Sequence, residues 1–117
     1  MTGDDLRRLA VALPEVEERL TWEVDITFRV RGKIFAIMGQ DGAQASVKAT
    51  LEAQQALVAS EPETFSVSAY TGRYGWTTVV LARVSAEELA ELVEDAWRRT
   101  APKRLVAAYD ATQKPMS

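Results

Sequence analysis

The side chains able to carry out acid–base chemistry in this sequence are its carboxylates, because the 117 residues contain no histidine and no cysteine. That composition excludes an imidazole base for a catalytic triad, a thiol nucleophile, a disulfide framework and a His/Cys zinc site. Five carboxylates gather in one stretch: Glu15, Glu17, Glu18, Glu23 and Asp25. Paired carboxylates catalyse only where they converge in a cleft and one is desolvated, and closeness in sequence shows neither. We interpret the stretch as a solvated acidic loop and expect a protein that is not an enzyme.

Glycine motifs give no support for a nucleotide cofactor. The sequence contains neither Gly-x-x-x-x-Gly-Lys nor Gly-x-Gly-x-x-Gly, the loops that cradle nucleotide phosphates. Gly-x-x-Gly occurs at 39–42 and at 72–75, but both adjoin predicted strands, whereas the KH loop that clamps nucleic acid joins two helices. We therefore expect no cofactor and no bound metal.

Basic side chains are unevenly distributed along a chain whose formal net charge is −3. Residues 1–27 hold three basic and seven acidic side chains, whereas residues 28–48 hold four basic side chains and one acidic side chain. Such positive stretches suit phosphate contacts, although Arg and Lys on hairpins also block edge pairing, and both interpretations remain open. The basic candidates for contact with DNA are Arg29, Arg31, Lys33, Arg73, Lys103 and Arg104.

Aromatic side chains in or beside the predicted loops are the second candidate contact set. Tyr74 and Trp76 flank the glycine loop at 70–75, where they could stack on bases. The alternative is that Trp22, Tyr70 and Trp76 line a groove for a protein segment or a small molecule, or cap the end of a sheet. By contrast, Phe28, Phe35 and Trp97 lie on apolar stripes and are expected in the core.

Hydrophobic periodicity predicts the elements that position these side chains. The strongest local signal is the capping box of Ser85 and Glu88, which precedes an apolar stripe reaching Trp97. The expected helices begin at caps Thr2 or Asp4, Thr50 and Ser85 and end before Pro14, Pro62 and Pro102, and a short terminal helix follows through Tyr109. The expected strands cover 27–38, folded into a hairpin with its tip at 31–33, then 45–48, 65–68 and 76–82.

This order of elements predicts an α+β fold of the type α-β(3)-α-β(2)-α. We expect a two-layer sandwich in which helices pack on an antiparallel sheet of about five strands. The size favours one domain over residues 1–109, followed by a frayed polar tail at 110–117. The acidic N-terminus is unlike a signal peptide and no apolar run is long enough to span a membrane, so a cytoplasmic protein with no membrane partner is expected.

The sequence resembles the MmcQ/YjbR family over nearly its whole length, roughly residues 6 to 106. The residues that carry the resemblance are Leu13-Pro14-Glu15-Val16-Glu17-Glu18, Trp22, the run from Phe28 to Ala36, Tyr74-Gly75-Trp76 and Ala101-Pro102-Lys103-Arg104-Leu105. The resemblance implies an α-β(3)-α-β(2)-α sandwich of the secretion-chaperone-like type. It also implies DNA binding by a double-wing arrangement, and it brings no catalytic residues.

The resemblance marks the hairpin residues Arg29, Arg31 and Lys33, and the segment 73–76, as the implied contact surface. Many relatives have an Asn-Lys-x-His-Trp run where this chain has Arg73-Tyr74-Gly75-Trp76, so one basic residue and the tryptophan remain. Our first hypothesis is a DNA-binding protein that contacts phosphates through the basic hairpin. The alternative hypothesis is a protein- or small-ligand-interaction module with no role on nucleic acid.

Overall fold

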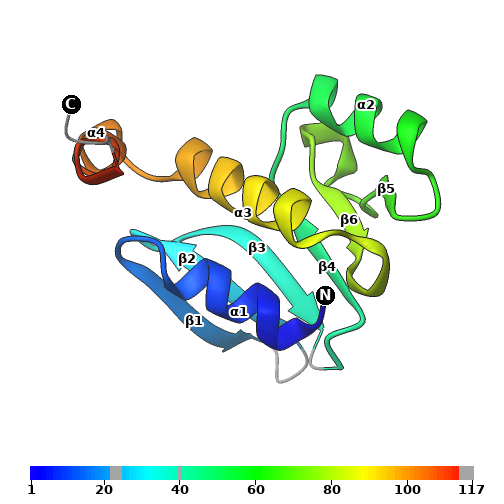
Figure 1. Ribbon diagram of the computed structural model, residues 1–117, viewed down its shortest axis with the longest axis horizontal. Coiled ribbons are helices and arrows are strands. Elements are labelled where there is room, and N and C mark those ends of the chain that lie inside the picture. The colour runs from blue at the N-terminus through cyan, green and yellow to red at the C-terminus, as the bar shows by residue number, and fades with distance from the viewer. Residues whose placement is uncertain (22–24, 40, 114–117) are drawn as a thin grey trace.

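A single antiparallel sheet organises the part of the chain that the computed structural model describes, which is residues 1–21, 25–39 and 41–113. Six strands lie in the order β1-β2-β3-β4-β6-β5 (Figure 1). The strands are β1 (Val16–Thr21), β2 (Asp25–Val30), β3 (Lys33–Gly39), β4 (Gln44–Val47), β5 (Phe65–Val67) and β6 (Thr77–Val80). The helices are α1 (Gly3–Val11), α2 (Leu51–Ser60), α3 (Ala86–Thr100) and α4 (Lys103–Gln113), with short 3-10 turns η1 (Gly72–Tyr74) and η2 (Leu81–Arg83). The α+β class is confirmed.

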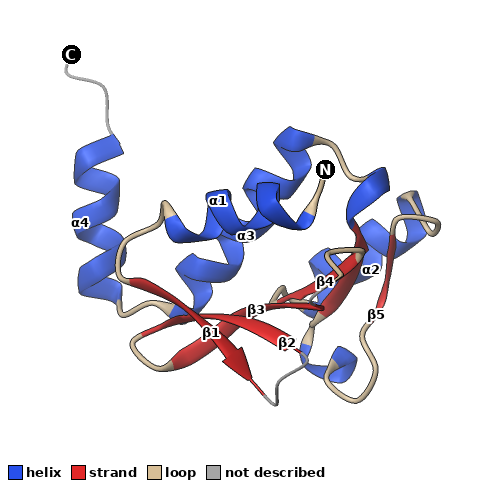
Figure 2. Cartoon of the chain, turned by 90° about the horizontal axis from the view of Figure 1, so that it is seen from below, coloured by secondary structure: helices blue, strands red, loops and turns tan. Residues whose placement is uncertain are grey.

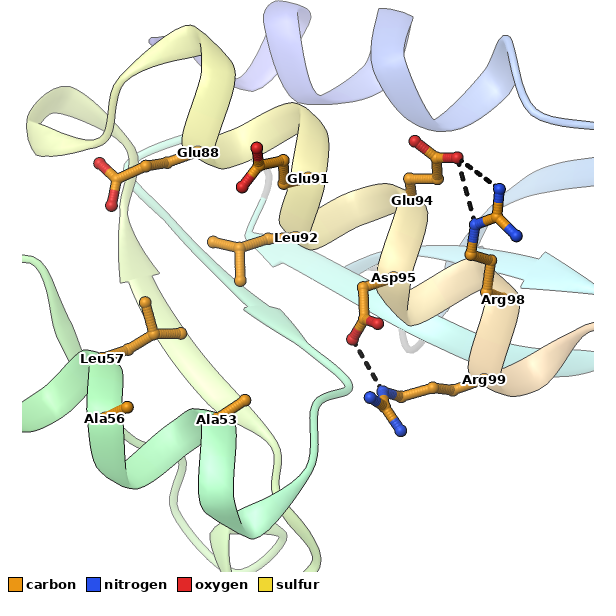
Figure 3. Close-up of a pocket in the computed structure, with 10 residues that line it drawn as sticks. All are labelled: Ala53, Ala56, Leu57, Glu88, Glu91, Leu92, Glu94, Asp95, Arg98 and Arg99. Atoms are coloured by element: carbon orange, nitrogen blue, oxygen red, sulfur yellow. Dashed lines mark hydrogen bonds and ion pairs between the residues drawn. The ribbon is translucent and has the colours of Figure 1, made fainter. Parts of the chain in front are cut away.

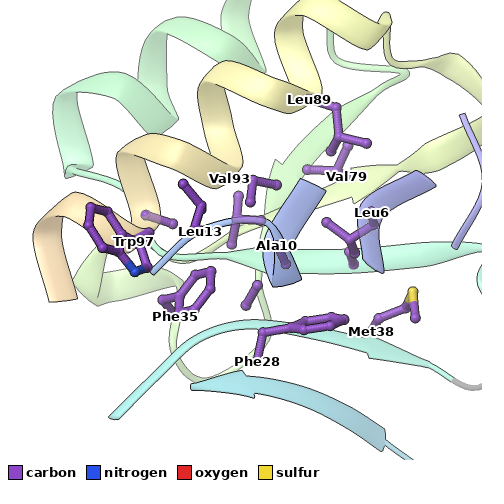
Figure 4. Close-up of a cluster of buried hydrophobic side chains, with 14 of the residues drawn as sticks. Leu6, Ala10, Leu13, Phe28, Phe35, Met38, Val79, Leu89, Val93 and Trp97 are labelled. Carbon is purple, nitrogen blue, oxygen red and sulfur yellow. The ribbon is translucent and has the colours of Figure 1, made fainter. Parts of the chain in front are cut away.

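The core lies between one face of the sheet and the helices α1 and α3, so the domain has two layers (Figure 2). Phe28 and Phe35 project from the sheet toward Leu6 of α1 and Val93 of α3 (Figure 4), and all four side chains are buried. Trp97 of α3 is also fully buried. The three aromatic residues expected in the core are therefore confirmed there.

The acidic stretch after α1 is a strand and not the loop that the sequence suggested. β1 pairs with β2 along its whole length, with Val16 opposite Val30 and Thr21 opposite Asp25. Its position at the sheet edge explains the error, because an edge strand keeps its backbone pairing while its side chains remain in water. Glu17 and Glu18 are exposed, as predicted, whereas Glu23 lies outside the described residues. The sheet therefore has six strands where about five were predicted.

Local capping signals predicted the helix starts correctly. The side chains of Thr2, Thr50 and Ser85 each accept a hydrogen bond from a backbone N–H in the first turn of their helix. The reciprocal capping box forms at Thr2, where the Asp5 carboxylate accepts from the Thr2 N–H at 2.7 Å. The capping box predicted at Ser85 is not reciprocal. There the Glu88 carboxylate accepts a hydrogen bond from the Ser85 hydroxyl, at 3.3 Å, and not from the Ser85 backbone N–H.

The last helix, α4, continues to Gln113, four residues beyond its predicted end at Tyr109. Residues 110–113 are therefore helical and not part of a frayed tail. Contacts with α3 explain the extension: Arg98 donates to the Asp110 carboxylate at 2.6 Å, and the Tyr109 ring packs edge-on against Trp97 with centroids 5.1 Å apart. Among the described residues, no helix is long and apolar enough to cross a membrane.

Candidate functional site

The tip of the β2–β3 hairpin carries two basic side chains on a strained turn. Arg31 and Gly32 both have a left-handed backbone, with φ of 51° and 80°, as a two-residue type I′ turn requires. Asn or Gly is favoured at such positions, and an arginine there is uncommon. Lys33 follows at the start of β3 and is exposed. The predicted hairpin tip at 31–33 is thus confirmed.

Arg31 forms a two-pronged ion pair with Glu15 in the turn before β1. Its Nε and NH2 groups donate to the two Glu15 carboxylate oxygens at 2.6 and 3.0 Å. This hydrogen bonding lowers the pKa of Glu15 and raises the pKa of Arg31. Glu15 is also left-handed, with φ of 57°, and the described chain has only one further non-glycine residue of this kind, Tyr70. Strained backbone of this sort is concentrated at functional sites.

The first turn of α4 lies beside this ion pair. A hollow of about 470 Å³ is lined by Glu15, Arg31, Pro102, Arg104, Leu105 and Ala108. The Pro102 carbonyl accepts from the Val106 N–H at 3.1 Å, so the N–H groups of residues 103–105 lie at the positive end of the helix. Lys103 and Arg104 add two cations to that end. We call the set Glu15, Arg31, Lys33, Lys103 and Arg104 the hairpin–α4 end.

Arg29 differs from its neighbours at the tip because it is held against the sheet. It is half-buried, and its Nε donates to the Thr27 hydroxyl at 3.2 Å. Across the β1–β2 ladder it stands opposite Glu17, whose carboxylate accepts from Arg19 at 2.7 Å. The predicted contact role of Arg29 therefore has less geometric support than that of Arg31 or Lys33.

The glycine loop after β5 forms a separate aromatic surface on the α2 side of the sheet. Tyr70 is 96% exposed and Tyr74 is 63% exposed, with the Arg73 guanidinium stacked over the Tyr74 ring at 4.8 Å. Gly75 has φ of 100°, and a Cβ there would lie 1.9 Å from the Ala49 carbonyl oxygen. The structure thus divides the eight predicted DNA-contact residues between this loop and the β2–β3/α4 side of the sheet.

The alternative groove of Trp22, Tyr70 and Trp76 stays a prediction. Trp22 lies outside the described residues, and Trp76 is half-buried, with its carbonyl accepting from the Gln54 amide at 2.7 Å. Tyr70 and Trp76 are not among the residues that line the hollow beside α4. Nor does any group of three acidic side chains in the described part of the chain come together to hold a metal ion.

Comparison with known proteins agrees with this architecture. The family model described as YjbR matches residues 11–99. The chain belongs to the YjbR family. The uncharacterized protein Rv2570 of Mycobacterium tuberculosis and the uncharacterized protein Mb2600 of Mycobacterium bovis are each 28% identical to it over 122 residues, which cover 92% of this chain and 95% of each relative.

A solved YjbR-like structure shares the fold. The crystal structure of Deinococcus radiodurans protein DR2400, whose family-model domain is DUF419, superposes with a TM-score of 0.74 at 27% identity. The match covers 82% of this chain and 75% of that chain. The family resemblance is thereby confirmed, and none of these names states an activity.

In this YjbR protein, Glu15 is the site residue whose role sequence reasoning missed. It stands one residue before β1, and the register that places Val16 opposite Val30 brings Glu15 beside Arg31. That register becomes readable only once β1 is recognised as a strand. The signal in the sequence is charge complementarity: the acidic segment before the basic hairpin could be its antiparallel partner, although it lacks the apolar alternation of a typical strand.

Proposed function

We propose that this YjbR protein is a non-enzymatic, cytoplasmic DNA-binding protein that contacts phosphates through its hairpin–α4 end. The observation that carries the proposal is that Arg31 and Arg104, distant in sequence, line one hollow at the positive end of a helix. Guanidinium forks and free backbone N–H groups are the donors that phosphate oxygens require.

The local charge supports the proposal although the whole chain is acidic. The hairpin–α4 end holds four basic side chains against Glu15 alone, a net charge of +3 on a chain of net −3. Phosphate contacts depend on the local density of Lys and Arg, because they act by releasing counterions from the nucleic acid. The acidic pI of about 5.0 therefore does not count against a small, localised contact.

Glu15 occupies the fork of Arg31 that a phosphate would use. Both side chains are about half exposed, at 47% and 56%, so water and salt already weaken their pairing. In the proposed mechanism a phosphate replaces the Glu15 carboxylate on the Arg31 guanidinium, and Lys33 and Arg104 complete the contact. The carboxylate then acts as an internal competitor that limits affinity at every DNA sequence.

The salt dependence of DNA association tests the proposal. We expect the wild type to bind mixed duplex DNA in a fluorescence anisotropy titration at low salt, with log K falling linearly in log salt. The variant R31A/R104A should bind more weakly, with a slope smaller by about 0.9 for each lost phosphate contact. The variant R8A/R83A removes the same charge from exposed arginines outside the site and should keep the wild-type slope.

Two outcomes would overturn the proposal. One is no association of the wild type with duplex or single-stranded DNA at low salt. The other is an equal loss of affinity in R31A/R104A and R8A/R83A, because binding would then follow net charge and not the hairpin–α4 end.

A further inference from the structure

A second hollow lies between α2 and α3 and has a different chemistry (Figure 3). Its volume is about 620 Å³, within the range of sites that accept ligands or peptide side chains. We call it the α2–α3 groove. It is lined by Ala53, Ala56 and Leu57 of α2 and by Glu88, Glu91, Leu92, Glu94, Asp95, Arg98 and Arg99 of α3.

The floor of the groove is apolar and partly open to water. Ala53 and Leu57 face Leu92 across it, and each of the three is only half-buried. The helix α2 buries Gln54, whose amide donates to the carbonyls of Gly72 and Trp76 at 2.9 and 2.7 Å. These bonds fix α2 to the η1 loop, so its apolar side chains are not closed against α3.

The acidic rim retains carboxylates that the groove's own arginines do not neutralise. Arg99 pairs with Asp95 at 2.7 Å, and Arg98 pairs with Glu94 at 3.0 Å. Glu91 has no cationic partner in the described part of the chain. The rim therefore presents negative charge beside an apolar floor.

One end of the rim brings two carboxyl groups together. Glu61, directly after α2, has Glu88 of α3 as its neighbour, and this neighbouring carboxylate raises the pKa of Glu61. Like charges in contact repel unless a proton or a cation lies between them. Glu61 and Glu88 thus add negative charge at this end of the groove, and neither forms an ion pair with an arginine or lysine of the described chain.

We infer that the α2–α3 groove binds an amphipathic helical segment of a partner protein, with apolar side chains on the floor and Lys or Arg against Glu88 and Glu91. Two helices that flank an apolar floor fit the mode in which a helix lies in a groove. The acidic rim selects a basic segment and rejects nucleic acid, because it would repel phosphates. The groove is thus a partner site in addition to the hairpin–α4 end.

Designed peptides provide the test on the full-length protein. The probe is a helical Leu/Lys peptide of roughly 18 residues, about five turns, with leucines along one face. A scrambled peptide of the same composition and a Leu/Glu peptide of the same pattern are the comparison probes. By isothermal titration calorimetry we expect the amphipathic Leu/Lys peptide to bind at least about tenfold more tightly than either, a difference of about 1.4 kcal/mol.

Matched variants locate the binding. Ala56 lines the floor and Ala59 is an exposed alanine outside the lining, so A56E should weaken the peptide about tenfold or more whereas A59E should not. In the same way, E88Q/E91Q should weaken it and E87Q, an exposed neighbour in the first turn of α3, should leave it unchanged. Circular dichroism shows that each variant is folded, and DNA binding of A56E should match the wild type.

Several results would overturn the inference. They are no binding of the Leu/Lys peptide, equal binding of the scrambled peptide, or equal effects of A56E and A59E. A wild type that sediments as a dimer and an A56E variant that sediments as a monomer would show that a second copy of the chain covers the groove. Displacement of the peptide by DNA would show that both ligands share one surface, which also contradicts the inference.

Discussion

The hairpin–α4 end and the α2–α3 groove both contain ion pairs between arginines and carboxylates, but the first region has a net positive charge and the second a net negative charge. At the hairpin–α4 end a single carboxylate, Glu15, lines the hollow together with Arg31 and Arg104, and Lys33 and Lys103 lie close to these arginines in the sequence. In the groove two arginines stand among four carboxylates and are both consumed by them. The presence of ion pairs therefore does not tell whether a site is positive or negative. The net charge of each site is the charge that remains after its own side chains have paired.

The helix α3 and its buried residue Trp97 join the two regions. Trp97 lies in the core, its indole N–H donates to the Pro14 carbonyl at 3.1 Å, and its ring contacts Tyr109 of α4. The same residue therefore holds both the turn that carries Glu15 and the helix that carries Arg104. Separating the regions experimentally begins with this residue.

The largest expected effect is that of W97A, which leaves a cavity and should destabilise the fold by about 3–5 kcal/mol. The milder W97F keeps most of the ring but leaves the Pro14 carbonyl without its donor, at a cost of roughly 1–3 kcal/mol. We expect W97F to weaken DNA binding and to leave peptide binding in the groove intact, as measured by urea unfolding and the two titrations. Equal loss of both activities in W97F would contradict the assigned role of Trp97.

A smaller effect, of opposite sign, is expected from E15Q. Removing the competing carboxylate frees the Arg31 fork, and the strength of exposed ion pairs suggests a gain in DNA affinity of about two- to fivefold at low salt. The control is E63Q, which makes the same charge change at an exposed residue paired with Arg83. If E15Q binds no better than E63Q, Glu15 does not compete with phosphate.

The smallest expected effects concern pH and have opposite signs in the two regions. The pKa of Glu15 is lowered on folding, so its contribution to stability is present above its ordinary value of 4.5 and is lost as pH falls through the lowered pKa. The pKa of Glu61 is raised, so its contribution is present below 4.5 and is lost as pH rises through the raised pKa.

The measurement is the free energy of unfolding of wild type, E15Q and E61Q from pH 3 to pH 7. Relative to wild type, E15Q should lose stability as pH rises and E61Q should gain it. In the peptide titration, the wild type should bind the Leu/Lys peptide more tightly as Glu61 deprotonates, and E61Q should lack that step. If the stability of E15Q and of E61Q changed with pH in the same direction, the opposite roles assigned to Glu15 and Glu61 would be wrong.

Local signals in the sequence predicted most of the fold. The caps at Thr2, Thr50 and Ser85 and the turn at Arg31 and Gly32 depend on neighbouring residues only, so spacing reveals them. The strand β1 was missed because its stability comes from pairing with β2 and not from burial of its charged side chains. The extension of α4 was missed because Arg98 and Trp97 of another helix stabilise it.

The candidate sites were less predictable because both depend on tertiary proximity. Residue type identified Arg31, Lys33, Lys103 and Arg104 as candidates, but only the fold places the hairpin beside α4. The α2–α3 groove had no signal at all in the sequence. Its floor residues look like an ordinary helix interior, and only the structure shows that α2 is fixed to the η1 loop and leaves them partly exposed.

The left-handed backbone of Arg31 places stability and charge in conflict at one position. Asparagine is the residue that the first position of this turn favours, so R31N would relax the chain while removing the cation that meets Glu15. Selection for thermal stability alone would therefore favour a more stable hairpin whose tip lacks the positive charge of Arg31. Retaining an arginine there means that the protein tolerates local strain in order to keep a positive charge at an exposed turn.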